Sequence, residues 1–283
     1  MTLKTILVHL NHEERLSELI AVATAIARQA EAHVIGLYVM PPLFTPSDLI
    51  VPMGPEIFEQ QVAAHETQAA RTKTVFERLT TGEPFVAEWR VHGDARSAYD
   101  DIAVGVIAEA RAAELVIVSQ ATGDKDPLVL VEVAERVALE SGRPVLVVPV
   151  AWSPRAFGTK VAIAWNDSRE AARAAFDALP LLRAAKQVQI ISIAETIDGT
   201  DRPEIPAAEI AATLARHGLN IDVKTIPSDG RHAGNTLLSC VAKEGADLLV
   251  MGAYGHSRLR EFILGGATRD VLKNMTVPIL LSH

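Results

Sequence analysis

The chain has 283 residues, of which 49% are hydrophobic and only 5% aromatic, and its formal net charge is −8. This length suits two domains of ordinary size, and the acidic balance argues against nucleic acid as the main partner. No apolar run approaches the roughly 20 residues needed to span a membrane, and the short apolar start, broken by His9, is unlike a signal peptide. We therefore expect a soluble, cytoplasmic protein that binds neither nucleic acid nor membranes.

The same order of elements occurs twice along the chain. Residues 6–11 and 161–166 are short apolar runs that end in Asn, and each precedes a polar turn and an Ala- and Leu-rich helical pattern, over residues 14–29 and 168–183. Short apolar runs that alternate with long helical patterns are typical of βαβ units and a parallel sheet.

The remaining elements also repeat in pairs. We expect second strands at 33–39 and 188–194, third strands at 85–91 and 221–226, helices at 102–112 and 237–243, fourth strands at 113–118 and 246–251, and last strands at 144–148 and 277–281. The sequence therefore predicts an α/β protein of two tandem, doubly wound, five-stranded parallel-sheet domains. The domains would span residues 1–152 and 158–283, and the last strands are the expected contacts between the two halves, because exposed apolar edges need cover.

The strongest local signal lies in residues 251–269, after the fourth strand of the second half. Gly252, Gly255 and Gly265 would let a ligand approach the backbone closely, and the N–H groups at a helix N-terminus attract phosphate. The fingerprints of P-loop and dinucleotide-binding proteins are absent from the sequence. The alternative is that these glycines serve only turns and close packing.

This spacing resembles the signature of the universal stress protein family, G-x2-G-x9-G-[ST], which in nucleotide-binding members wraps the ribose and phosphates of ATP. Gly252, Gly255 and Gly265 match it, whereas Gly266 stands at the hydroxyl position and Thr268 offers a hydroxyl two residues later. The resemblance implies the universal stress protein fold, which is like that of the adenine nucleotide alpha hydrolases, in a tandem, two-repeat member.

The resemblance also implies which residues hold the ligand. The family has an Asp at the end of its first strand, where this chain has Asn166, and a backbone contact to adenine after its second strand, at Ile193. Alternatively, Asn166 and Ser168 only make a turn and a helix cap. The expected ligand is ATP or another adenine nucleotide, with or without Mg²⁺. The predicted binding residues are Asn166, Ile193, Met251, Gly252, Gly255, His256, Arg258, Gly265, Gly266, Ala267 and Thr268.

The N-terminal half differs at the corresponding loop. Residues 119–127 are shorter than the glycine loop and lack its spaced glycines, so we interpret the first domain as a degenerate site with a structural or partner-docking role. His9 and His12 follow its first strand, where polar turn chemistry and a ligand role are both open.

The proline-rich segment at residues 41–55 is expected to be a long irregular connection. Its apolar residues suggest that it packs over a neighbouring part of the chain or a partner.

The sequence offers no nucleophile elbow, no convincing pair of catalytic carboxylates and no metal-binding cluster. We assign no catalytic or metal-binding residue, and we expect at most slow ATP hydrolysis. Two functions stay open. The first is a stress protein that binds an adenine nucleotide in its C-terminal domain and signals to a protein partner. The second is an interaction scaffold of the same fold without nucleotide. The repeat would form a pseudo-dimer within one chain, and a homodimer is a further option.

Overall fold

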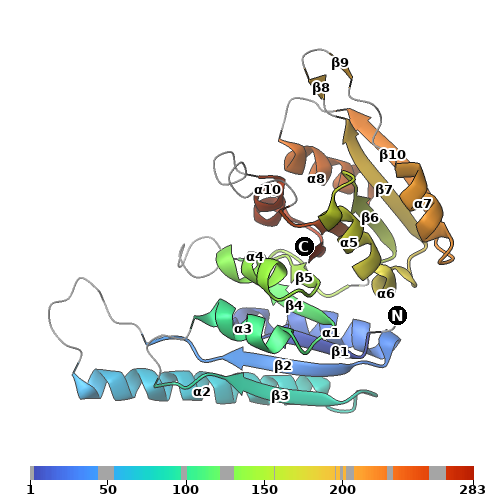
Figure 1. Cartoon of the computed structure of the whole chain (residues 1–283). Helices are drawn as coiled ribbons and strands as arrows, with labels where there is room; N and C mark the ends of the chain where they lie inside the picture. The colour runs from blue at the N-terminus through green and yellow to red at the C-terminus, as the bar shows by residue number, and fades with distance from the viewer. Residues whose placement is uncertain are drawn as a thin grey trace. The chain divides into compact units, whose positions relative to one another are not determined.

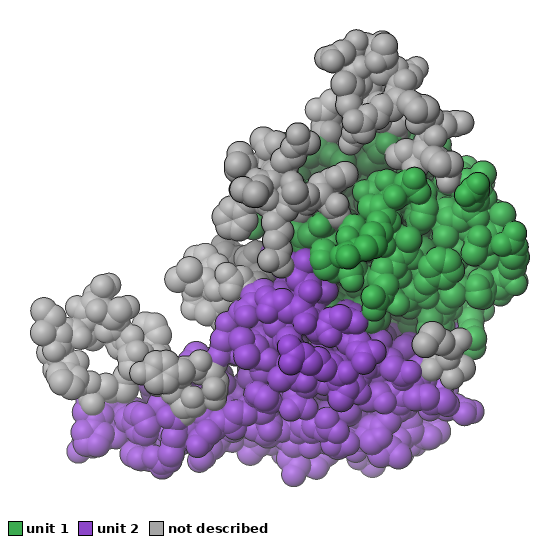
Figure 2. Space-filling model, viewed as in Figure 1, with its two compact units in different colours: residues 1–2, 144–283 green, residues 3–143 purple. Residues whose placement is uncertain are grey.

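The computed structural model describes residues 3–43, 54–96, 101–121, 131–155, 157–194, 196–197, 200–201, 207–227, 232–254 and 266–283. The chain divides into two compact units (Figure 2). The N-terminal unit comprises residues 3–143, and the C-terminal unit contains residues 144–283. None of the helices in the described ranges is long and apolar enough to cross a membrane.

The N-terminal unit holds a parallel sheet in the strand order β4-β1-β2-β3 (Figure 1). Its elements follow the predicted alternation of strands and helices. They are β1 Thr5–His9, η1 Glu13–Arg15, α1 Leu16–Ala30, β2 His33–Val39, α2 Pro55–Thr80, β3 Ala87–His92, α3 Ile102–Ala110, β4 Leu115–Ser119 and α4 Val131–Glu140.

The helices of this unit cover both faces of the sheet. Side chains alternate between the faces of a strand, and in β2 Gly36 lies against Phe76 of α2, whereas Val39 lies against Gly105 of α3. A Cβ atom at Gly36 would come within 2.8 Å of the Phe76 ring, and one at Gly105 within 2.7 Å of Val39. Both glycines therefore allow close helix packing, and the layers are those of a doubly wound sheet.

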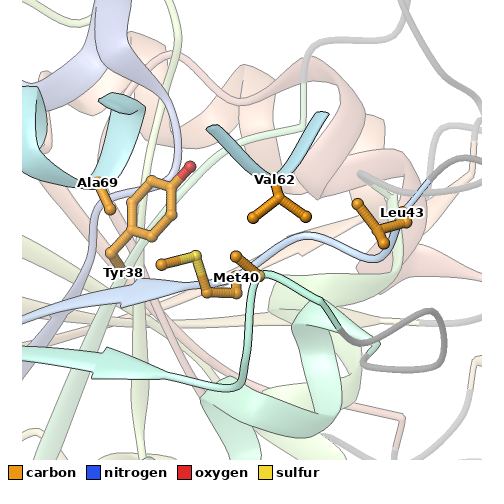
Figure 3. Packing of buried hydrophobic residues seen from close by; sticks show 6 residues of the cluster. Tyr38, Met40, Leu43, Val62 and Ala69 are labelled. Carbon is orange, nitrogen blue, oxygen red and sulfur yellow. The ribbon is translucent and has the colours of Figure 1, made fainter. Parts of the chain in front are cut away.

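An apolar cluster fills the space between α2 and the end of β2 (Figure 3). It is composed of Tyr38, Met40, Leu43, Val62, Ala69 and Ala95, with Phe58 and Trp89 packed against it. Leu43, which begins the apolar part of the proline-rich segment, is 3% exposed here, so this residue packs on its own unit. Residues 44–53 lie outside the described ranges.

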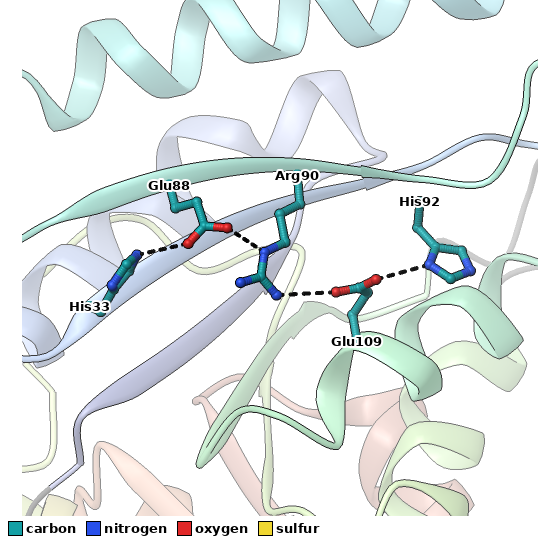
Figure 4. A network of polar contacts seen from close by, with 5 residues as sticks. All are labelled: His33, Glu88, Arg90, His92 and Glu109. Carbon is teal, nitrogen blue, oxygen red and sulfur yellow. Dashed lines mark hydrogen bonds and ion pairs between the residues drawn. The ribbon is translucent and has the colours of Figure 1, made fainter.

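A chain of polar contacts joins β2, β3 and α3 on the same unit (Figure 4). Glu88 contacts both His33, at 3.3 Å, and Arg90, and Glu109 contacts Arg90 at 3.3 Å and His92 at 3.0 Å. The hydrogen bond from Arg90 lowers the pKa of Glu88. These side chains are a quarter or more exposed, so each pair adds little stability. We interpret this series of contacts as a link between β3 and α3.

The C-terminal unit has the strand order β10-β7-β6-β11-β12-β5, in which every pair is parallel except β12 with β5. A separate antiparallel pair, β8 with β9, was not predicted. The elements are β5 Val145–Val148, β6 Lys160–Ala164, α5 Arg169–Asp177, α6 Leu179–Leu182, β7 Gln187–Ala194, β8 Thr196–Ile197, β9 Thr200–Asp201, α7 Ala207–Ala215, β10 Ile221–Pro227, α8 Ala233–Glu244, β11 Leu248–Gly252, α10 Ala267–Asn274 and β12 Ile279–Ser282.

The two halves repeat one another in residue detail. In both halves, a carboxylate just before the fourth strand accepts a hydrogen bond from the backbone at the start of the first strand. Glu114 accepts a hydrogen bond from the Thr5 N–H at 2.9 Å, and Asp247 accepts one from the Lys160 N–H at 3.1 Å. The strand order and this shared contact confirm the predicted α/β class and its tandem organisation.

The strand β5 is antiparallel to β12, where Val147 pairs with Ile279 and Val145 with Leu281. All four residues are fully buried. Because β5 hydrogen-bonds to β12, it belongs to the C-terminal unit, and the compact units divide after Arg143. The boundary predicted from the linker, between residues 152 and 158, lies further along the chain, beyond β5, and stays a prediction for the sequence domains.

Candidate functional site

The candidate site lies at the carboxyl ends of β6, β7 and β11 in the C-terminal unit. The strand β6 stands between β7 and β11, and all three run parallel. The chain passes from β6 to β7 on one side and returns to β11 on the other, so the strand order reverses at β6. In open α/β sheets this switch point is where ligands bind.

The turn after β6 combines a side-chain turn with a helix cap. The Oδ1 atom of Asn166 accepts a hydrogen bond from the Ser168 N–H at 3.3 Å, and the Ser168 Oγ accepts one from the Ala171 N–H at 3.1 Å. Asp167 between them has a positive φ of 60°. Asn166 and Ser168 therefore form a turn and a helix cap. Because the Asn166 side chain is also exposed at the strand end, a ligand contact there stays a prediction.

Ile193 occupies the end of β7, where it pairs with Ile226 and is half-buried. The neighbouring strand end is held in place by the N–H of Trp165, which donates to the Ile191 carbonyl at 2.8 Å. The indole Nε1 of Trp165 is buried and has no hydrogen-bond partner in the part of the chain that the structure describes. Nothing in the sequence singles out Trp165, because an aromatic residue after a strand is an ordinary core residue.

Gly252 ends β11 and lies against the first turn of α5. A Cβ atom there would come within 2.5 Å of the Glu170 carbonyl carbon and 2.6 Å of the Ala171 nitrogen. The preceding Met251 is 6% exposed. Close packing alone therefore accounts for glycine at position 252, whether or not a ligand also approaches it.

The helix α10 opens at Gly266, which has the extended angles φ −55° and ψ 155° and provides no side-chain cap. Thr268 is 2% exposed, and its Oγ1 accepts a hydrogen bond from the Tyr254 N–H at 3.4 Å. This contact joins the start of α10 to the end of β11. The Thr268 hydroxyl oxygen, which we expected to face a ligand, thus already has a partner in the protein.

The N–H groups at the start of α10 point out of the helix end, where they can donate to a hydrogen-bond acceptor. The helical hydrogen bonds begin with the N–H groups of Arg269 and Asp270, which both donate to the Gly266 carbonyl. The N–H groups of Ala267 and Thr268 precede these bonds and lie at the open, positive end of the helix.

The position of α10 is fixed from its other side by α8. A Cβ atom at Gly234 would lie 2.8 Å from the Ala267 carbonyl oxygen and 3.0 Å from the Asp270 Cβ. Close packing at Gly234 therefore holds the start of α10 near the sheet edge.

The structure thus brings Asn166, Ile193, Met251, Gly252, Gly266, Ala267 and Thr268 to the strand ends and helix start of one unit. Gly255, His256, Arg258 and Gly265 lie outside the described residues, and their roles stay predictions. Within the described ranges, no three His, Cys, Asp or Glu residues are grouped so that they could hold a metal ion.

The matching turn of the N-terminal unit is built differently. Asn11 Nδ2 donates to the Val39 carbonyl at 2.6 Å, and Asn11 Oδ1 accepts from the Val39 N–H at 2.9 Å. Asn11 therefore links the ends of β1 and β2, whereas Asn166 bonds within its own turn. In the sequence, Asn11 and Asn166 occupy equivalent positions of the repeat, which do not reveal this difference.

A sequence profile of the Universal stress protein family matches residues 158–283. The C-terminal half belongs to the universal stress protein family. The match covers β6 to β12 and includes every residue of the candidate site. We call residues 158–283 the universal stress protein domain from here on.

Solved structures extend the likeness of fold to the whole chain. A universal stress protein from Archaeoglobus fulgidus has a TM-score of 0.71 at 17% identity, covering 98% of this chain and 95% of its own. A functionally unknown protein from Pseudomonas aeruginosa has a TM-score of 0.59 at 16% identity, covering 99% of this chain and 92% of its own. At these identities the comparison concerns the fold alone, so the N-terminal unit shares the architecture.

The curated universal stress protein Slr1230 from Synechocystis is 33% identical over 67 residues. These residues are 24% of this chain and 22% of that protein. The alignment therefore spans less than a quarter of the relative's length.

Proposed function

We propose that the universal stress protein domain binds an adenine nucleotide, ATP or a close relative with or without Mg²⁺, and that a protein partner reads the bound state in a stress response. The observation that carries the proposal is the start of α10. Its N–H groups at Ala267 and Thr268 lie beside the end of β11, at the point where the strand order reverses. The nucleotide class follows from the spacing of Gly252, Gly255 and Gly265, which resembles the family's signature.

The start of α10 suits a phosphate group. The open end of a helix carries partial positive charge and N–H donors, which together favour a bound anion. Gly266 has no side chain that would compete for these donors or block the approach. Anion attraction in this site would therefore come mainly from the backbone, with His256 and Arg258 as additional donors.

The ribose and the base would lie along the ends of β6 and β7. Asn166 is exposed there and has an amide that can both donate and accept. It lacks the charge of the family's Asp, so we expect weaker discrimination between ribose hydroxyls than an aspartate would give.

A nucleotide-free scaffold is the second candidate, and particular contacts favour it. Asn166 Oδ1 is already bonded to the Ser168 N–H, and the Thr268 hydroxyl oxygen to the Tyr254 N–H. Helix packing explains Gly252 without a ligand. The scaffold would work through its surface, and its partners would not respond to ATP.

The substitution Ala267→Pro tests the phosphate contact with little disturbance of the helix. Proline is favoured at the first residue of a helix, where its missing N–H breaks no helical bond, and the ψ of 155° at Gly266 suits a residue before proline. The variant removes one phosphate donor, so we expect ATP to bind about tenfold more weakly, the loss of one hydrogen bond to a charged group, while adenosine binds as before.

The matched control is Ala233→Pro at the first residue of α8, where His232 has a ψ of 136°. This variant should keep the affinity of the original chain for ATP. Equal ATP affinities in the Ala267→Pro variant and the original chain would exclude the proposed phosphate position. Mass spectrometry of the ligand retained by gently purified protein would then decide between another nucleotide position and the scaffold.

A further inference from the structure

Basic side chains gather at the carboxyl ends of β1 and β4 in the N-terminal unit. His9 is the last residue of β1, and its ring lies edge-on to that of His12, with the ring centroids 6.2 Å apart. Arg15 ends η1, and its Nε donates to the Oγ of Ser119, the last residue of β4, at 3.4 Å. Because β1 and β4 are parallel neighbours, these side chains share one edge of the sheet.

The cluster has a buried inner part and a half-exposed outer part. His9 is 2% exposed and Arg15 is 5% exposed, whereas His12 and Ser119 are half-exposed. The Nε2 atom of His9 is buried and has no hydrogen-bond partner among the residues that the structure describes. Buried polar atoms nearly always have a partner in folded proteins, so this atom has the capacity for one more hydrogen bond.

The electrostatics of the cluster favour an added anion. Burial and, to a smaller extent, the neighbouring His12 lower the pKa of His9 to about 3, although a hydrogen bond with Asn11 acts in the opposite direction. Burial also lowers the pKa of His12, where Glu14 opposes the shift and Arg15 adds to it. Arg15 contributes a guanidinium group. The site thus combines one fixed cation with two imidazoles that an anion would help to protonate.

The backbone groups at the adjacent strand end are already hydrogen-bonded. Asn11 occupies both the N–H and the carbonyl of Val39, and the Met40 N–H donates to the His92 carbonyl at 2.8 Å. The backbone groups on which a base would pair at the end of β2 therefore have partners within the protein. This arrangement favours a small ligand over a nucleotide.

We propose that His9, His12 and Arg15 form an anion site for one phosphate-sized dianion, either free in solution or carried by a small phosphate ester. The imidazole N–H groups and the guanidinium would donate to its oxygens, since charged donors make the strongest hydrogen bonds to anions. The site lies in the N-terminal unit, so the test of this proposal is independent of the test of nucleotide binding by the universal stress protein domain.

Sulfate is the probe of choice for the full-length chain, because its charge stays at −2 over the pH range in which histidine titrates. Nuclear magnetic resonance of the histidine rings would be followed from acid to neutral pH in sulfate and in chloride of equal ionic strength. We expect sulfate to raise the pKa of His12 and to bind more tightly as the pH falls. Titration curves of His9 and His12 that coincide in the two salts would overturn the proposal.

The variant His12→Gln removes one donor from the half-exposed part of the cluster, and His217→Gln makes the same exchange at an exposed position of the other unit. We expect the first to weaken sulfate binding about tenfold and the second to leave it unchanged. Equal sulfate affinities in both variants would contradict the proposal. If His12→Gln does not fold, the ring titration of the unaltered chain still decides.

Parallel titrations with inorganic phosphate and glycerol phosphate would identify the source of the anion. Tighter binding of inorganic phosphate would support a free anion, and tighter binding of the ester would support a small phosphorylated metabolite. Binding of neither, under conditions where the protein is folded, would overturn the proposal.

Discussion

A side chain at position 252 would collide with Glu170. The Cβ of such a side chain would lie 2.5 Å from the Glu170 carbonyl carbon and 2.8 Å from its Cβ, both below any normal contact. The close approach of α5 to the end of β11 therefore depends on glycine at this position. The glycine that begins the family's signature thus has a packing role that exists without a ligand.

The first prediction concerns this contact. Gly252→Ala should lower the free energy of unfolding by about 1–3 kcal/mol, the usual cost of adding a methyl group to a packed site. The control is Gly54→Ala, because Gly54 has a negative φ of −65° and its added Cβ would meet no atom of the described residues within 4 Å. Urea unfolding would measure both variants. Equal stabilities would show that α5 moves away at little cost.

The second prediction compares the two asparagines that follow the first strands. Asn11→Ala removes both hydrogen bonds to the buried Val39, so we expect a loss of about 1–3 kcal/mol in the free energy of unfolding. Asn166→Ala removes one bond of 3.3 Å at an exposed position, and we expect a loss of at most about 0.5 kcal/mol. Equal losses in thermal or urea unfolding would contradict the different roles of the two residues.

The sequence predicted most of the architecture because its signals are local and repeated. The second strand of the first half was predicted at 33–39 and observed at His33–Val39. The helix predicted at 168–183 is broken at Ala178, because Pro180 lacks the N–H that would continue the helix. The two-residue strands β8 and β9 are too short to show an alternating pattern, and the prediction missed them.

The candidate site was only partly predictable. The strand ends and the helix start at Gly266 follow from the repeat and from the glycine spacing. The partners of individual side chains do not follow from these patterns. Asn11 and Asn166 occupy the same place in the repeat, yet Asn11 bonds across to β2 and Asn166 bonds within a turn that has a left-handed Asp167. Such contacts depend on tertiary packing, which one sequence does not reveal.

The third prediction concerns pH. The pKa of His9 is about 3 in the folded chain and about 6.5 when unfolded. Between these values the unfolded chain binds more protons, so the free energy of unfolding should fall as the pH is lowered from about 6.5 to 3, by up to about 1.4 kcal/mol per pH unit from His9. Urea unfolding in chloride buffers would measure this dependence.

The comparison needed for that experiment is the variant His9→Gln, which removes the titrating group. Its stability should fall less steeply with acid than that of the original chain, while His217→Gln should follow the original chain. Arg28 lowers the pKa of Glu83 by a hydrogen bond, and protonation of such carboxylates in acid also lowers the free energy of unfolding. This effect is the same in the original chain and in both variants. The difference in the slope of unfolding free energy against pH therefore reports the contribution of His9. Identical slopes would contradict the low pKa of His9.

The most direct test of nucleotide binding is a calorimetric titration of ATP into the full-length chain, with adenosine titrated in parallel. We predict saturable binding of one ATP per chain, and weaker binding of adenosine, because the start of α10 contacts only the phosphates. Two equivalent sites would show that the N-terminal unit was misinterpreted. An absence of saturable ATP binding by folded protein would contradict the nucleotide proposal and leave the scaffold function in its place.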